Sequence, residues 1–151
     1  MFTALLIIHG LLAVALLGAV THQAASVLWP VTRPAGSFTG RFRSVAAPGY
    51  ANAIVLLYLV TFILGAILYT EYRIFIRPLV EDLRAWSAFG SFELKEHFAA
   101  IGMGMLPAYW YLWRRPPDGR TRTIVTALLA FIVWWNFLTG HILNNIRGFG
   151  S

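Results

Sequence analysis

The sequence predicts an all-α integral membrane protein, an up-down-up-down bundle of four transmembrane helices with a short interfacial amphipathic helix. Hydrophobic residues make up 58% of the chain and charged residues only 12%, well below the quarter that is usual in a soluble domain. Four apolar runs each match the hydrocarbon thickness of a bilayer. Their short connections favour an antiparallel bundle. The 151 residues indicate a single transmembrane domain, residues 1–151.

The predicted spans cover about residues 2–29, 50–72, 91–113 and 123–145. The first span ends before Pro30, and because no basic residue precedes it, we interpret it as an uncleaved span and not as a signal peptide. Residues 78–89 carry apolar side chains at helical spacing, which predicts the amphipathic helix at the membrane interface. Pro107 predicts a kink in the third span. The last connection is the tight loop before residue 123.

Charge asymmetry predicts the orientation of these spans. The chain carries a net charge of +6, and the first and third loops hold seven arginines and one acid: Arg33, Arg41, Arg43, Arg114, Arg115, Arg120, Arg122 and Asp118. The opposite side is balanced, with five basic and five acidic residues. By the positive-inside rule both termini are extracytoplasmic, in a membrane of the bacterial inner or cell-membrane type. Topology and anionic lipid thus explain the basic loops without nucleic acid as a partner.

Three histidines are predicted to lie at one depth near the extracytoplasmic surface. His9 lies about 10 Å from the start of the first span, at 1.5 Å per residue. His97 follows the start of the third span by one to two turns, and His141 precedes the end of the fourth by a similar distance. Polar side chains inside a membrane usually face the bundle interior, and imidazole is a frequent ligand of haem iron and other transition metals. We therefore expect these histidines to bind one haem b or, as an alternative, a metal ion.

The residues around this layer suit a flat macrocycle. Gly10 and Gly140 adjoin two of the histidines, while Ala100 and Gly104 share the predicted face of His97. The second span carries a stripe at spacings of three and four that is predicted to face inward: Tyr58, Thr61, Gly65, Tyr69 and Tyr72. Aromatic packing is available from Trp134 and Phe137. On the extracytoplasmic side, three arginines are candidates to pair with haem propionates: Arg73, Arg77 and Arg147.

Carboxylates near the layer have two interpretations. Glu93 precedes His97 by four residues, which predicts that it orients the imidazole as an outer-shell partner. Alternatively, Glu93, Glu96 and Glu71 relay protons from a quinol. A third reading is structural, because acids favour the first turn of a helix. His22, without a histidine partner at its depth, is expected to be an interfacial residue, so that only one haem is predicted.

The layout of four short-looped spans, with His9, His97 and His141 near one face, resembles the small b-type membrane cytochromes that anchor respiratory dehydrogenases. The resemblance covers the whole chain as a layout. It implies electron transfer between a quinone pool and a protein redox partner, within a larger respiratory-type complex. Two histidines would be axial ligands and the third would bind a quinone or a propionate. Diagonal first and third helices favour His9 with His97, whereas the flanking glycines favour His9 with His141.

Two other function classes remain open from the sequence. A metal site or conduit would use His9, Glu93, His97 and His141 to bind copper, zinc or iron. A cofactor-free structural subunit would use the same histidines for interhelical hydrogen bonds. The absence of cysteine excludes disulfides, thiolate metal sites and cysteine-linked haem. The small extramembrane regions argue against a self-contained enzyme.

Overall fold

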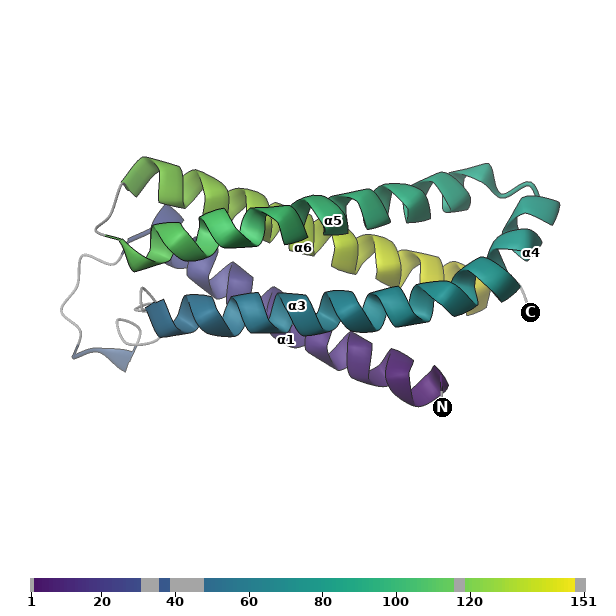
Figure 1. Cartoon of the computed structure of the whole chain (residues 1–151), viewed down its shortest axis with the longest axis horizontal. Helices are drawn as coiled ribbons and strands as arrows, with labels where there is room; N and C mark the ends of the chain where they lie inside the picture. Colours follow the sequence, from purple (N-terminus) through teal and green to yellow (C-terminus); the bar gives the residue numbers. More distant parts are fainter. Residues whose placement is uncertain (1, 31–35, 39–47, 116–118, 149–151) are drawn as a thin grey trace.

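The computed structural model describes residues 2–30, 36–38, 48–115 and 119–148, without the side chains of Pro48 and of residues 144–148. Every element in these ranges is helical. The four long helices are α1 (Phe2–Leu28), α3 (Pro48–Glu71), α5 (Trp86–Arg114) and α6 (Gly119–Gly148). Figure 1 shows them extended along one long axis, with the start of α1 and the end of α6 at the same end. The all-helical prediction is confirmed.

Three of the long helical segments are long and apolar enough to cross a membrane: Phe2–Leu28, Gly49–Asp82 and Gly119–Leu143. Their outer surfaces carry bare hydrophobic side chains, such as Leu11, which is 66% exposed, and Phe131, which is 54% exposed. Such surfaces are compatible with a lipid bilayer and indicate membrane association. Helix α5 is less apolar, because the first half of its 29 residues contains four ionisable side chains: Glu93, Lys95, Glu96 and His97.

The predicted interfacial helix at residues 78–89 is not a separate element. A π-helical turn, η1 (Tyr72–Ile76), and a short helix, α4 (Arg77–Asp82), continue α3 without a break. The Arg77 backbone N–H donates to the Tyr72 carbonyl, and Pro78 stands in the first turn of α4, where its missing N–H leaves no bond unmade. The chain reverses at Arg84, whose φ is 52°, and α5 begins two residues later. The expected segment is therefore divided between α4 and the first turn of α5.

The helices pack as a bundle in which α1 and α5 are diagonal. Helix α1 contacts α3 and α6, and α5 contacts the same two helices. Buried residues gather in the half of the bundle away from the start of α1; those of α1 are Leu16, Val20, Gln23 and Ala24. Two buried hydrogen bonds hold this half together, from Tyr109 to Gln23 and from Trp113 Nε1 to Thr126 Oγ1. The opposite half contains the cavities described next.

Candidate functional site

A large cavity, here called the outer cavity, opens between the helices at the end where α1 starts. Its volume is about 490 Å³, within the range of small-molecule and cofactor sites. Side chains from α1, α3, η1, α5 and α6 line it. Ten residues singled out from the sequence are among them: His9, Gly10, Gly65, Tyr69, Glu71, Tyr72, Glu96, Phe137, Gly140 and His141. The structure therefore gathers most of the predicted site around one space.

His9 and His141 are the two histidines that line the outer cavity. His9 is half-buried and lies against Gly65, where an added Cβ would be 3.2 Å from its Cε1 atom. The buried Nδ1 of His9 has no hydrogen-bond partner among the described residues. The ring of His141 stacks parallel to Phe137, with ring centres 6.2 Å apart. Neighbouring helices α1 and α6 thus each supply one imidazole to the same space.

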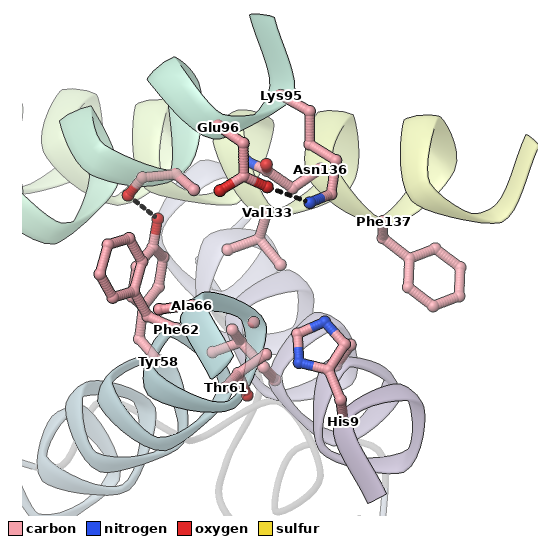
Figure 2. A pocket seen from close by; sticks show the side chains of 14 residues that line it. His9, Tyr58, Thr61, Phe62, Ala66, Lys95, Glu96, Val133, Asn136 and Phe137 are labelled. Carbon is pink, nitrogen blue, oxygen red and sulfur yellow. Dashed lines mark hydrogen bonds and ion pairs between the residues drawn. The ribbon is translucent and has the colours of Figure 1, made fainter. Parts of the chain in front are cut away.

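A smaller inner cavity of about 110 Å³ continues from the outer one and shares His9 with it. Figure 2 shows its polar side chains converging from four helices: His9, Thr61, Lys95, Glu96 and Asn136. Lys95 Nζ lies 2.7 Å from Glu96 Oε1. This ion pair stands inside the bundle, where polar groups are costly and usually serve a function.

Two further polar atoms near the inner cavity have unused hydrogen-bonding capacity. The amide nitrogen of Asn136 donates to the Ile132 carbonyl at 2.8 Å, and because a carbonyl only accepts, the amide orientation is fixed. Asn136 Oδ1 is therefore an acceptor, and both it and Thr61 Oγ1 are buried without a partner among the described residues. Such atoms cost free energy unless a ligand or water satisfies them.

Aromatic rings form one wall of the outer cavity. Tyr72 and Phe92 stack with centroids 3.6 Å apart and an interplanar angle of 13°, and Tyr69 lies nearly parallel to Phe92. Lys95 Nζ stands 5.0 Å from the centroid of Phe92. The inward stripe predicted on the second span is confirmed at these positions, since Thr61, Gly65 and Tyr69 all line a cavity.

His97 stands apart from the other two histidines. Its side chain is exposed and lines neither cavity. Its Nδ1 lies 2.7 Å from the backbone oxygen of Glu93, so the main chain of Glu93, and not its carboxylate, contacts the ring. Ala100 and Gly104, which share the His97 face, are exposed as well. The described residues contain no group of three or more His, Asp or Glu side chains arranged to hold a metal ion.

Of the three predicted propionate partners, the two whose side chains are described, Arg73 and Arg77, line neither cavity. Arg77 is held by Glu81 at 2.9 Å and by Glu93 at 3.7 Å, and its guanidinium lies 4.8 Å from the centre of the Phe89 ring. Arg73 is exposed and lines neither cavity. The side chain of Arg147 lies outside the described residues. Arg77 therefore ties α4 to α5, and Glu93 serves that contact.

Lys95 and Asn136 are site residues that the sequence reasoning missed. Lys95 precedes the buried Leu106 by eleven residues. At about 100° per residue, this spacing places the two side chains within about 20° of each other around the axis of α5. By the same rule His97 lies about 180° from Leu106. The face of α5 that is buried in its second half therefore also carries Lys95 in its first half, and His97 lies on the opposite face.

Comparisons with protein-family models, with curated proteins and with solved structures find no match to this chain. The functional assignment therefore depends on the geometry of the two cavities.

Proposed function

We propose that the protein is a haem b-binding membrane subunit that carries electrons, with His9 and His141 as the axial ligands. The observation that supports this proposal is the shared position of the two imidazoles on adjacent helices around one cofactor-sized cavity. His97, which faces away, is left out of the ligand pair. This selects one of the two pairings that the sequence leaves open.

The residues of the outer cavity fit such a group. Gly10, Gly65 and Gly140 line the cavity without side chains, and at Gly10 even an added Cβ would meet no atom within 4 Å. The aromatic wall offers a flat apolar face, and Lys95 offers a cation for a propionate. A bound haem b supplies a reversible one-electron carrier. Phe137 would hold the His141 ring in position, and Lys95 would orient an acidic substituent.

We further propose that α5 is a fourth span, which completes an up-down-up-down bundle with extracytoplasmic termini. Supporting this, Lys95 and Glu96 face the cavities, so these two charged side chains of α5 are turned away from lipid. The positive-inside rule places the loops before α3 and before α6 in the cytoplasm. The cofactor would then lie near the extracytoplasmic surface, within reach of a redox partner in a larger respiratory-type complex.

The test is an optical spectrum of detergent-purified protein, oxidised and reduced. A Soret band and split visible bands on reduction are expected for the wild type. His9→Ala and His141→Ala should each lose these bands, whereas His97→Ala, which removes an imidazole that lines neither cavity, should retain them. If His97→Ala lost the haem bands while His141→Ala retained them, the proposed ligand pair would be refuted. If the wild-type protein stayed colourless after reconstitution with haemin, haem binding itself would be refuted.

A quinone is the second ligand we propose, for the inner cavity, and the unused atoms described there favour it. Asn136 Oδ1 is an acceptor and Thr61 Oγ1 both donates and accepts, so together they match a hydroxyl-bearing quinol ring. Position supports the same conclusion, because the inner cavity adjoins the outer cavity through His9. A quinol bound there would contact His9, one of the two residues that would hold the haem.

A further inference from the structure

The end of the bundle opposite the cavities carries a second feature, formed by the last turn of α5. Arg114 lies over Trp110, with its guanidinium carbon 4.2 Å from the ring centroid. Arg115 lies over Tyr111 in the same way, at 4.4 Å. Each arginine is four residues after its aromatic partner, and Arg115 directly follows Arg114, the last residue of α5, so the two pairs are neighbours at the end of this helix.

Helix α3 fixes one of these pairs in place. Asn52 Oδ1 accepts a hydrogen bond from Trp110 Nε1 at 2.8 Å and another from Arg114 Nη2 at 3.3 Å. Both the ring and the guanidinium are therefore held between α3 and α5. A stacked guanidinium keeps its N–H edge directed outward, and an arginine has five N–H donors, most of which Arg114 leaves available.

The surroundings of this pair of arginines are apolar and free of described carboxylates. Trp110 is 40% exposed and Tyr111 is 47% exposed, as expected of aromatic rings at a membrane interface. All described Asp and Glu residues lie between positions 71 and 96. The closest along α5, Glu96, is eighteen residues from Arg114, which is about 27 Å of helix. Asp118 lies outside the described residues.

We infer that Arg114, Arg115, Trp110, Tyr111 and Asn52 form a binding site for the headgroup of an anionic phospholipid. The two guanidinium groups bind the phosphate oxygens, since a planar fork of donors matches a phosphate. The aromatic rings stand at the level where headgroup and acyl chain meet. Charge complementarity selects a lipid with net negative charge over a zwitterionic one. This inference does not depend on a bound haem.

The test is a titration of the full-length protein in detergent with lipids whose acyl chains are brominated and quench tryptophan fluorescence. Phosphatidylglycerol is expected to bind at least tenfold more tightly than phosphatidylcholine. The variant R114Q/R115Q should lose roughly 30-fold in affinity for phosphatidylglycerol, and Arg115→Gln alone about fivefold, from the usual contribution of one arginine near an anionic surface.

The matched control is R73Q/R84Q, which removes the same charge from two exposed arginines at the other end and should keep the wild-type affinity. Equal binding of the two lipids, or equal loss in both double variants, would overturn the inference. Complete competition by inorganic phosphate would also overturn it, since the site would then bind a soluble anion. Arg115→Gln removes a guanidinium that stacks on one exposed ring, and it keeps the test decisive if the double variant does not fold.

Discussion

Replacing Gly102 by alanine tests how α3, α5 and α6 pack together. A Cβ at this buried position would overlap the Tyr58 hydroxyl oxygen, and would lie 2.8 Å from Tyr58 Cζ and 3.0 Å from Ile132 Cγ2. Tyr58 is only 5% exposed, and its hydroxyl donates to the Ala99 carbonyl at 2.9 Å. The ring must therefore move and give up that bond.

The expected cost combines two effects. Overpacking a well-filled core costs about 1–3 kcal/mol, and a buried hydroxyl without its partner costs about 1–3 kcal/mol. Movement of the Tyr58 ring would relieve the overpacking but would break its hydrogen bond. We therefore expect Gly102→Ala to lower the free energy of unfolding by about 2–4 kcal/mol. The matched control is Gly104→Ala, on the same helix, where an added Cβ meets nothing within 4 Å. That variant should gain up to about 1 kcal/mol from helix propensity.

The assay is equilibrium unfolding in mixed detergent micelles, with the Tyr58→Phe substitution combined with each alanine variant. Removing the Tyr58 hydroxyl oxygen should relieve part of the overlap in Gly102→Ala, so we expect a coupling free energy of about 1 kcal/mol or more between Tyr58→Phe and Gly102→Ala. We expect no coupling between Tyr58→Phe and Gly104→Ala. If the two alanine variants are equally stable, or if the coupling is absent, Tyr58 does not pack over Gly102 and the relative positions of α3 and α5 are wrong.

Two further predictions concern other contacts. Gly65→Ala should displace the His9 ring, because the new Cβ would be 3.2 Å from its Cε1 atom, and so should alter the visible spectrum of the haem-loaded protein. Gly18→Ala, on the same helix as His9, has open space at its Cβ and lines neither cavity, so it should leave that spectrum unchanged; identical spectra for both would contradict the geometry. Gln23→Ala should destabilise the protein by about 1–3 kcal/mol, since it leaves the fully buried Tyr109 hydroxyl without its acceptor; thermal unfolding measures this, and Tyr109→Phe in the same background should recover part of the loss.

The positions of the long helices along the chain were predictable, whereas the direction of each side chain around its helix was predictable only in part. Apolar runs and loops located every long helix, because a helix rises by a fixed length per residue. The second span showed its inward face through a stripe of small and hydroxylated residues, and Thr61 and Gly65 do face the cavities. For the third long helix the histidine itself was used to choose the face, and that choice placed His97 inward although its side chain is exposed.

The end of the helix near Pro78 was not predictable from the sequence, for a different reason. A proline normally indicates that a helix ends before it, because its ring clashes with a carbonyl of the preceding turn. Here a π-helical turn precedes the proline, so the helical path continues for six more residues as α4. Nothing in the periodicity of residues 72–82 distinguishes a π turn from a helix end. The contacts of Arg77 with Glu93 and Phe89 on α5 support the continuation of the helix as α4. A sequence pattern contains no information on such tertiary contacts.

The two halves of the bundle differ in how completely they are packed. On α1 the buried residues begin at Leu16, and on α5 they begin at Gly102, so both diagonal helices are packed in one half and border cavities in the other. Cavities lower stability because their lining atoms lack contacts. A chain that keeps about 490 Å³ open beside buried polar atoms without partners is therefore incompletely packed by itself. A ligand that binds only the folded state would supply the missing contacts and stabilise this half by mass action, which is why the cavity end is where a cofactor would contribute most.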